Sequence, residues 1–578
     1  MNGGRCQEEI SVKQVVAIGI QDFEVLRTKN LFYVDKTDFI REWWNGEDAV
    51  TLITRPRRFG KTLNMSMLNC FFSNQYQNRG ELFEGLRIWE DSEMRKQQGK
   101  WPVIFLSFAD IKASTFEDTK TSLNQTITKL YNQFDWMMQD ERFSDREREL
   151  FSAVGIHMDA AVAARSLQNL CDWMRKYYGK KVLVFLDEYD TPLQEAYIHG
   201  CWDELVSYTR ALFNSTFKTN PSLERGIMTG ITRVSKESIF SDLNNLTVVT
   251  TTSPRYATAF GFTEEEVYTA LEEQGYDGAS KAEVKAWYDG FTFGTTTDIY
   301  NPWSVINYLK NGKLDVYWAN TSSNGLVGTL LLGADPEIKQ HFEALMRGET
   351  IEVSFDEQII FNQLDDDRDA IWSLLLASGY LKVMDARGLR EPSLLWSRPV
   401  YPLALTNLEV RIMFTELIRG WFREGTPLST FVKYMIDGET EGMENYLNDL
   451  MMHSMGSFDG RQEAERERPE CFYHGLVLGL IADQEERYLI RSNRESGYGR
   501  YDVMLEPIGK GLPGIILEFK VYSSRKGETG LEDTAQSALD QIEQKRYETE
   551  LLDRGIPETM IRKYGIAFKG KECRIMMA

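Results

Sequence analysis

Residues 50–72, VTLITRPRRFGKTLNMSMLNCFF, join an apolar run of strand-forming residues to a segment rich in Leu, Met and Phe. The turn between them contains Gly60, Lys61 and Thr62. Backbone N–H groups at a helix start bind phosphate oxygens, a lysine neutralises the β- and γ-phosphates, and a hydroxyl ligates Mg²⁺. The stretch is therefore typical of a strand, a phosphate-binding loop and a helix. The residues expected to contact the nucleotide are Arg58, Phe59, Gly60, Lys61, Thr62 and Leu63.

The loop departs from the usual phosphate-loop pattern at one position. In G-x-x-x-x-G-K-[ST], the first glycine stands where this chain has Arg55. The motif alone is therefore of moderate specificity. Two interpretations remain for Arg55, Arg57 and Arg58: they clamp phosphates, or they only decorate the loop.

A second stretch supplies the carboxylates that ATP hydrolysis needs. Residues 181–193, KVLVFLDEYDTPL, are typical of a hydrophobic strand that ends at Asp187 and Glu188. A carboxylate at a strand end can hold Mg²⁺, and the adjacent one can orient and deprotonate the attacking water. We therefore expect Thr62 and Asp187 to hold Mg²⁺ and Glu188 to be catalytic.

A third strand, RGIMTGIT at 225–232, is expected beside the strand that ends in Asp187. A polar residue at its tip could sense the γ-phosphate, which makes Thr229 or Thr232, and Arg233, candidates. The alternative is a strand end with ordinary hydroxyl caps, and the sequence does not choose between the two.

The first half of the chain alternates apolar runs with helical stretches. The runs are at 50–57, 102–108, 181–188, 225–232 and 247–253. Strands without polar alternation suit a parallel sheet that is covered on both faces. This predicts a three-layer α/β domain of the P-loop NTPase type over 1–261, followed by a mostly helical region over 262–464 with helical spacing at 264–275, 301–312 and 369–383.

The last region, 465–578, has the element order α-β-β-β-α-β. We expect a helix over 472–484, strands over 486–495, 499–507 and 513–523, a long helix over 531–555 that ends at Gly555, and a final strand over 563–577. The second and third strands carry Asp502, Glu518 and Lys520. Period-two alternation puts Glu518 and Lys520 on one strand face.

These three residues match what metal-dependent phosphodiester cleavage requires. Carboxylates converge on Mg²⁺, and a cation steadies the attacking hydroxide or the charged transition state. We expect Asp502 and Glu518 to be catalytic metal ligands and Lys520 to be the catalytic lysine. Glu470 and His474 are spaced i, i+4 on the preceding helix, and His474 is either a third ligand or a packed histidine. Gln541 fits a supporting role.

The chain resembles the predicted AAA-ATPase-like proteins of bacteria that carry a C-terminal PD-(D/E)XK nuclease-like domain. The matching segments are 18–37, 55–64, 184–193, 230–246, 287–309 and the stretch from FYHG to EFK near the end. The resemblance implies nucleotide binding and a restriction-endonuclease-like C-terminal fold. It also implies that a missing first glycine is tolerated, that a first-helix His or Glu completes the metal site, and that Tyr33 to Thr37 lie near the nucleotide base.

Composition limits the remaining choices. The six cysteines are scattered without a CxxC pair, which argues against a zinc site or disulfide framework. The start lacks a secretory pattern, and no apolar run is long enough to span a membrane, so we expect a cytoplasmic, non-membrane protein. The net charge of -21 means that nucleic acid can bind only at a local basic patch. One candidate patch is Arg562, Lys563, Lys569, Lys571 and Arg574.

Together these patterns predict ATP binding and hydrolysis, fused to a Mg²⁺-dependent nuclease that processes DNA or RNA. The alternative is a nucleotide-gated switch that binds nucleic acid without cleaving it. The presence of Asp502, Glu518 and Lys520 favours the enzyme. The hypothesis of a helicase or translocase is weaker, because no strand-tracking motifs lie between the ATPase region and the nuclease region. Many ATPases of this class take an arginine from a neighbouring subunit, so a homo-oligomer stays among the expected partners.

Overall fold

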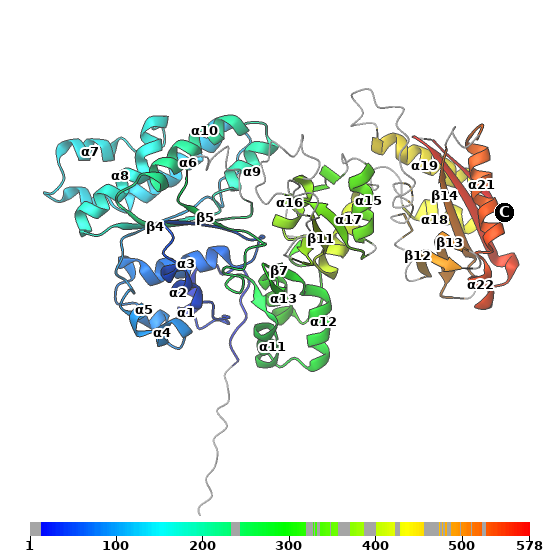
Figure 1. Cartoon of the computed structure of the whole chain (residues 1–578), viewed down its shortest axis with the longest axis horizontal. Coiled ribbons are helices and arrows are strands. Elements are labelled where there is room, and N and C mark those ends of the chain that lie inside the picture. Colours follow the sequence, from blue (N-terminus) through cyan, green and yellow to red (C-terminus); the bar gives the residue numbers. More distant parts are fainter. Residues whose placement is uncertain are drawn as a thin grey trace, which may run out of the picture. The chain divides into compact units, whose positions relative to one another are not determined.

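A computed structural model describes most of the chain (Figure 1). The described residues are 13–232, 243–319, 327–328, 330–331, 336–346, 348–355, 370–385, 400–421, 428–455, 473, 477, 480–481, 487–496, 499–509, 511–522, 528–570 and 572–578. The chain divides into two compact units, called here unit 1 (1–323 with 350–410) and unit 2 (324–349 with 411–578). This division shares the middle region between the units, and the predicted domain limits at 261 and 464 stay a prediction.

The core of unit 1 is a five-stranded parallel sheet with the order β2-β3-β4-β1-β5. Its strands form from Val, Ile, Leu and Phe runs, and β1 and β3 are buried along their whole length, as a sheet covered on both faces requires. The parallel sheet expected from the sequence is confirmed. The strands are β1 (Val50–Thr54), β2 (Val103–Ser107), β3 (Val182–Asp187), β4 (Leu223–Gly230) and β5 (Leu246–Val249).

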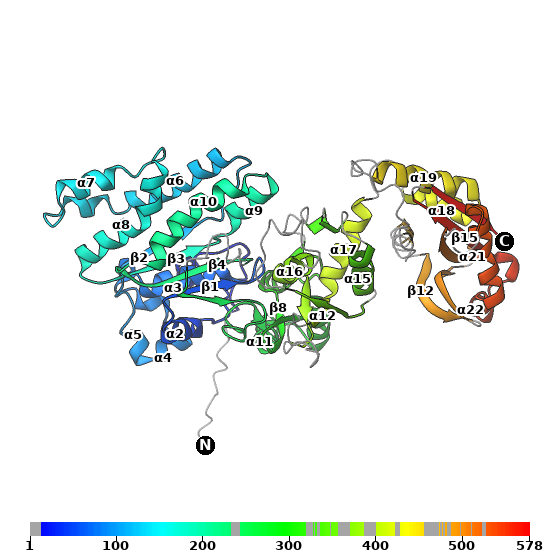
Figure 2. The ribbon, with the colours of Figure 1, turned by 45° about the horizontal axis from the view of Figure 1, so that its top comes forward.

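Helices cover both faces of this sheet, which confirms the three-layer arrangement (Figures 1 and 2). One face carries α6 (Phe116–Asn132), α8 (Ala160–Tyr178) and α10 (Trp202–Phe213), and the other carries α2 (Asp38–Asn45) and α3 (Lys61–Phe72). On the α2 side, the Trp43 ring packs edge-on against Phe72 and Phe185. The other helices of this part are α1 (Phe23–Thr28), α4 (Arg87–Glu90), α5 (Ser92–Arg95), α7 (Asp145–Ser152) and α9 (Thr191–Ile198).

The strand order places two sequence motifs at one edge of the sheet. Strand β4 lies between β1, which leads into the phosphate loop, and β3, which ends at Asp187. Because all three strands are parallel, their carboxyl ends meet at the same edge. The phosphate loop after β1 and the Asp187 carboxylate at the end of β3 are therefore separated by a single strand, β4.

The remainder of unit 1 contains helices and two small antiparallel sheets. The sequence predicted a mostly helical region here and did not predict the sheets. The sheets have the orders β6-β8-β7 and β10-β11-β9. Residues 369–383 were expected to be helical, but α16 ends before Gly379, whose φ of 86° is left-handed, and β10 follows. The elements are α11 (Glu264–Glu273), α12 (Gly278–Tyr288), α13 (Pro302–Asn311), α16 (Ala370–Ala377), β6 (Phe262–Thr263), β7 (Phe291–Phe293), β8 (Thr296–Tyr300), β9 (Ile351–Ser354), β10 (Leu381–Val383) and β11 (Val400–Leu405).

Unit 2 is built on a five-stranded mixed sheet with the order β12-β13-β14-β15-β16. Only the β14–β15 pair is parallel. The strands are β12 (Tyr488–Ser496), β13 (Gly499–Pro507), β14 (Gly514–Val521), β15 (Ile561–Lys569) and β16 (Glu572–Met577). The helices are α15 (Pro336–Met346), α17 (Leu408–Trp421), α18 (Leu428–Asp437), α19 (Thr440–Met455), α21 (Leu531–Lys545) and α22 (Thr549–Asp553), of which α17 crosses the division between the units.

Alternate residues of this sheet face two separate hydrophobic clusters. Leu517 and Phe519 pack with α18, α19 and the described residues 473, 477 and 480–481. Met504 and Ile516 pack with α21 and its neighbours. By period-two alternation, Asp502, Glu518 and Lys520 therefore lie on the α21 face.

Two expectations for unit 2 were wrong. The stretch 563–577 was expected to be one strand, but it forms the β15–β16 hairpin, with Lys569 paired to Glu572 and Gly570 at φ 61° in the two-residue turn. The long helix over 531–555 is two helices, because Arg546 takes a left-handed φ of 54° after α21. The expected helix over 472–484 lies largely outside the described residues, although its described positions are helical and buried.

Candidate nucleotide and nuclease sites

The phosphate loop leads into a helix start that no side chain caps. Gly60 precedes α3 with a φ of 81°, in the left-handed region that favours glycine. No side-chain hydrogen bond caps the first turn of α3, so its N–H groups are not satisfied in that way. Uncapped N–H groups at a helix start suit the oxygens of a phosphate.

Lys61 lies folded back on its own loop. Its side chain is 3% exposed, and its Nζ donates to the carbonyls of Arg55 and Pro56, each at 2.9 Å. Burial lowers the pKa of Lys61, and nearby carboxylates, of which Glu188 has the largest effect, oppose that shift. The ammonium group therefore lies in a negative environment at the carboxyl edge of the sheet.

Asp187 is bound by hydroxyls from two different elements. Thr62 of α3 donates to Oδ2 at 2.8 Å, and Thr229 of β4 donates to Oδ1 at 2.5 Å. Burial raises the pKa of Asp187, and these two hydrogen bonds oppose the rise. A hydroxyl and a carboxylate side by side are hard oxygen donors, which fit Mg²⁺. The structure brings Thr62 and Asp187 together, and their role as metal ligands stays a prediction.

Glu188 occupies a strained backbone conformation next to this carboxylate. Its φ is 49°, which is uncommon for a residue with a Cβ. Its backbone N–H donates to the Thr229 hydroxyl at 3.4 Å, and its Oε2 accepts from the Thr191 hydroxyl at 3.2 Å. Such a conformation persists only where the surroundings fix it, so these contacts hold Glu188 at the edge of the site.

The two threonines proposed at the tip of β4 contact different carboxylates. Thr229 donates to Asp187, whereas the Thr232 hydroxyl donates to Asp190 at 3.1 Å. Asp190 lies in the same sequence motif as Asp187, and no role was predicted for it from the sequence. Arg233 lies outside the described residues, and γ-phosphate sensing by any of these groups stays a prediction.

Arg55, at the position of the missing first glycine, belongs to the core. Its side chain is completely buried and donates to the carbonyls of Thr54 and Thr250, at 2.9 and 2.8 Å. Its guanidinium also lies 4.3 Å from the centre of the Phe293 ring. Neither interpretation made from the sequence holds for Arg55, because it neither faces the phosphates nor decorates the surface.

The side chains of Arg58 and Phe59 in the phosphate loop pack against the smaller elements of unit 1. Arg58 stacks on Trp303, 4.4 Å from the ring centre. Phe59 is 1% exposed and contacts Phe291 and Phe293 edge-on, at 4.7 and 5.5 Å between ring centres. Phe59 can therefore contact a nucleotide only through its backbone, which narrows the expectation from the sequence.

The buried Glu409 holds Trp318, and Trp318 in turn contacts the phosphate loop. Trp318 donates from its indole to the Arg57 carbonyl at 3.0 Å, and its own backbone N–H donates to Glu409 at 2.6 Å. Glu409 also accepts from the Ser304 hydroxyl at 2.8 Å. Burial raises the pKa of Glu409 to about 7 against these hydrogen bonds.

We expect Glu409 to make the stability of unit 1 depend on pH. Its pKa is higher in the folded chain than in the unfolded chain, so its contribution is present below about pH 4.5 and is lost as the pH rises through about 7. The loss is about 3 kcal/mol. Glu409→Gln keeps an acceptor for Trp318 and should flatten the profile. Urea midpoints followed by tryptophan fluorescence from pH 5 to 8 test this, and parallel profiles for the two proteins would contradict it.

The segment from Tyr33 to Thr37 has structural contacts that the sequence did not predict. Lys36 pairs with Glu266 at 2.5 Å and donates to the Thr258 carbonyl at 2.8 Å. The Tyr33 ring packs edge-on against Phe23. These contacts fix the segment within unit 1, and its proximity to a nucleotide base stays a prediction.

In unit 2, the side chains of the predicted nuclease motif meet on one face of the sheet. Asp502 accepts a hydrogen bond from the backbone N–H of Phe519 at 2.8 Å, and Glu518 accepts one from the N–H of Asp502 at 3.3 Å. Gln541 of α21 donates to Glu518. Lys520 donates to the Ser537 hydroxyl at 3.0 Å. The two carboxylates are adjacent, and Lys520 points towards the same helix as Glu518.

The carboxylates offer the hard oxygen ligands that Mg²⁺ prefers, and Glu518 is only 3% exposed. A buried carboxylate is costly without a cation or strong donors, so this pair fits a divalent ion. Glu470 and His474 lie outside the described residues, and the third ligand is not placed.

Two of the four described residues of the basic patch proposed from the sequence pair with acidic side chains. Arg574 pairs with Glu444 and Glu532, both at 2.9 Å, and Lys563 pairs with Glu548 at 3.5 Å. Lys571 lies outside the described residues. The described part of the patch therefore gives little support for a free nucleic-acid surface.

Glu264, Asp289 and Asp298 form an acidic cluster in the smaller elements of unit 1. Their carboxylate oxygens lie within 4.8 Å of one another. Lys285 forms ion pairs with all three. This lysine neutralises the cluster in part, so the group is explained as a network of ion pairs.

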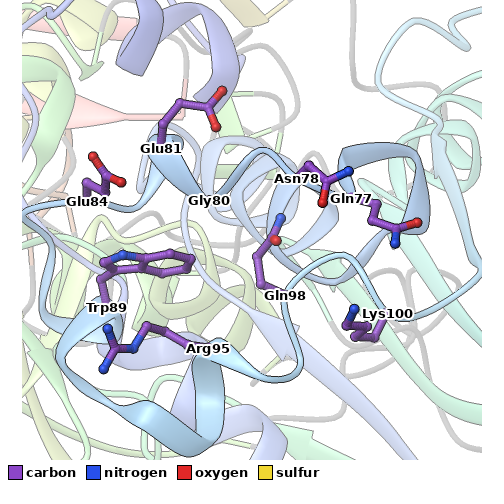
Figure 3. Close-up of a pocket in the computed structure, with 9 residues that line it drawn as sticks. All are labelled: Gln77, Asn78, Gly80, Glu81, Glu84, Trp89, Arg95, Gln98 and Lys100. Atoms are coloured by element: carbon purple, nitrogen blue, oxygen red, sulfur yellow. The ribbon is translucent and has the colours of Figure 1, made fainter.

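Unit 1 also has a surface pocket that the sequence did not predict (Figure 3). Trp89 lies among polar and charged side chains there. The lining residues are Gln77, Asn78, Gly80, Glu81, Glu84, Trp89, Arg95, Gln98 and Lys100. None of them belongs to the phosphate loop or to the Asp187 strand, so the pocket is not part of the nucleotide site.

The parallel five-stranded sheet of unit 1 is consistent with a P-loop-like α/β domain, and the mixed sheet of unit 2 with a nuclease-like α/β domain. Residues 17–240 match the family model described as predicted AAA-ATPase, and residues 468–578 match that of the PD-(D/E)XK nuclease superfamily. The chain therefore combines a predicted AAA-ATPase domain with a PD-(D/E)XK nuclease-superfamily domain. A protein of Azotobacter chroococcum mcd 1, described as an uncharacterized protein in the vnfD 5' region, is 24% identical over 411 residues, 70% of each chain. In the described part of the chain, no helix is both long and apolar enough to cross a membrane.

Proposed function

We propose that the chain binds and hydrolyses ATP in unit 1, and that unit 2 cleaves phosphodiester bonds of a nucleic acid with a divalent metal ion. The observation that carries the proposal is the contact of Thr62 and Thr229 with Asp187, beside Lys61 at the carboxyl edge of a parallel sheet. Hydroxyl, carboxylate and lysine are the groups that bind Mg²⁺ and the β- and γ-phosphates.

Each residue has a distinct task in this proposal. Lys61 leaves the loop carbonyls and binds the phosphates, while the first-turn N–H groups of α3 bind their oxygens. Thr62 and Asp187 would hold Mg²⁺, and the ion would supply positive charge next to the phosphates. Glu188 orients the attacking water and accepts its proton.

In unit 2, Asp502 and Glu518 would hold the metal ion, which activates water and stabilises negative charge when bound. Lys520 would stabilise the transition state, and Gln541 would orient Glu518. The nucleotide-gated switch that binds without cleaving remains the alternative, and it would be supported if the chain binds oligonucleotides but cuts none with Mg²⁺ or Mn²⁺.

Lys61→Met is expected to weaken ATP binding by on the order of 100-fold, because a charge-assisted contact to phosphate is replaced by an apolar chain of similar length. Calorimetric titration of ATP with Mg²⁺ measures the affinity. Lys129→Met, at an exposed position of α6, is the control and should bind like wild type. Equal affinities of Lys61→Met and wild type, at unchanged thermal stability, would contradict the proposed nucleotide site.

A further inference from the structure

Asp190 is placed as a helix N-cap but does not cap its helix. It precedes α9, and its side chain accepts no hydrogen bond from the first turn of that helix. Capping by Asp normally stabilises a helix by about 1 kcal/mol. The carboxylate of Asp190, which is 1% exposed, is turned away from this favourable position.

The carboxylate of Asp190 instead binds the chain that follows β4. Its Oδ2 accepts from the backbone N–H groups of Ile231 and Thr232, each at 2.9 Å, and from the Thr232 hydroxyl at 3.1 Å. Gln194 also donates to this oxygen at 3.1 Å. Burial raises the pKa of Asp190, and the hydrogen bonds from Thr232 and Ile231 oppose that rise. Four donors on one buried oxygen make this a firm connection between two loops.

The approach of Asp190 to β4 depends on a glycine. A Cβ at Gly230 would lie 2.7 Å from Oδ1 of Asp190, closer than atoms can pack. Oδ1 is buried and has no hydrogen-bond partner among the described residues. The pair Asp190 and Gly230 therefore allows the two chain segments to lie in direct contact.

The same two segments hold the residues proposed for hydrolysis. Asp187 is bound by Thr229, and the N–H of Tyr189 donates to the Thr229 carbonyl at 3.0 Å. The hydroxyl of Tyr189 donates to the Thr232 carbonyl at 2.8 Å. Residues 187–190 are thus joined to residues 229–232 along their whole length, with Glu188 in its strained conformation between the ends.

A further contact extends this connection to the phosphate loop. Gln194, which donates to Asp190, accepts from the guanidinium of Arg57 at 3.2 Å. The phosphate loop, the start of α9 and the end of β4 are therefore linked through the side chains of Arg57, Gln194 and Asp190.

We propose that Asp190 is a positioning residue for ATP hydrolysis, which holds the turn at 187–190 against the end of β4 so that Glu188 faces the attacking water. The inference rests on the proposed ATPase activity. Asp190 touches neither nucleotide nor water in this role and acts through Glu188. A misplacement of about 1 Å in a catalytic group can lower a rate about 100-fold.

Asp190→Asn is expected to lower kcat by roughly 10-fold to 100-fold, because the strong acceptor of Ile231 and Thr232 is replaced by a neutral one. The affinity for ATP should stay within about twofold of wild type, since Lys61 and the helix start bind the phosphates. Gln194→Met, at a half-buried position, removes one of the donors to Asp190 and the acceptor of Arg57, and should give a smaller loss of kcat. Gln194→Met therefore tests the inference if Asp190→Asn does not fold.

The decisive measurement is made in two backgrounds. If Asp190 acts through Glu188, then Asp190→Asn should reduce kcat less than twofold when Glu188 is already Gln, because coupled residues are not additive. A purely structural effect would be the same in both backgrounds. The control is Asp172→Asn, which replaces the charged acceptor of the Ser222 hydroxyl by a neutral one at the other end of β4 and should leave kcat unchanged.

Wild-type kcat in Asp190→Asn, or an equal fold-loss in both backgrounds, would overturn the inference and leave the proposed ATPase intact. A wild-type chain that binds ATP but does not hydrolyse it would overturn both. Phosphate release measured per bound nucleotide, with ATP affinity measured separately, distinguishes these results.

Discussion

Glu188→Gln is expected to keep ATP binding within about twofold of wild type and to lower the rate of hydrolysis by about 10²-fold to 10³-fold. The substitution preserves the size of the side chain and its contact with Thr191, which lies 3.2 Å from Oε2. It removes only the capacity to accept a proton from water. Binding of the phosphates, assigned to Lys61 and the start of α3, should therefore persist.

Fluorescent ATP titration and phosphate release measure the two quantities separately. Glu195→Gln is the matched control, because Glu195 lies on the adjacent helix α9, where its Oε2 lies 3.8 Å from Nε2 of His199. It should hydrolyse ATP like wild type. A Glu188→Gln chain with the wild-type rate would show that another group activates water, and one that no longer binds ATP would show that Glu188 positions the loop.

The fold of the first part could be predicted because its signals are local. The predicted strands of the parallel sheet are apolar runs, of which β1 and β3 are buried along their whole length, and Gly-Lys-Thr marks the strand-to-helix turn. The hairpin of β15 and β16 was missed although Gly570 marks its turn, because the apolar alternation continues on both sides. The break after α21 was missed because Arg546 takes a left-handed conformation that its residue type does not signal.

The candidate sites could be predicted only where the residues of a recognisable sequence motif also contact one another in the folded chain. Thr62, Asp187 and Thr229 meet because parallel strands end at the same edge. Asp190 resembles an ordinary N-cap in sequence, and its contact with Ile231 and Thr232 exists only in the folded chain.

Arg55 shows the converse case. A charge in a phosphate-loop motif suggests a phosphate ligand, yet its guanidinium donates to the carbonyls of Thr54 and Thr250 and lies over the Phe293 ring. Because the donors of the loop turn to other residues of unit 1, the smaller sheets and helices of that unit fix the loop as much as the large sheet does. A change in the phosphate loop on nucleotide binding would therefore first alter the contacts of Phe59 and Trp318.

Glu518→Gln is expected to abolish metal-dependent cleavage, with a loss of at least 10²-fold, and to weaken binding of the divalent ion. A hard cation needs negative charge from its ligands, and Asp502 alone would supply half of the charge that the described pair offers. The amide can still accept from Gln541, so the face of the sheet towards α21 should keep its packing. ATP hydrolysis in unit 1 should be unchanged unless the two activities are coupled.

The test uses labelled single- and double-stranded DNA and RNA with Mg²⁺, Mn²⁺ or EDTA. Glu506→Gln is the matched control, because Glu506 lies on β13 with Asp502 but pairs with Arg491 and Arg554, at 3.0 and 2.7 Å. It should lose some stability but not cleavage. If Glu518→Gln cuts as fast as wild type, the active site lies elsewhere. If wild type binds the oligonucleotides and cuts none of them, the intact carboxylates serve binding, and the nucleotide-gated switch becomes the better account of unit 2.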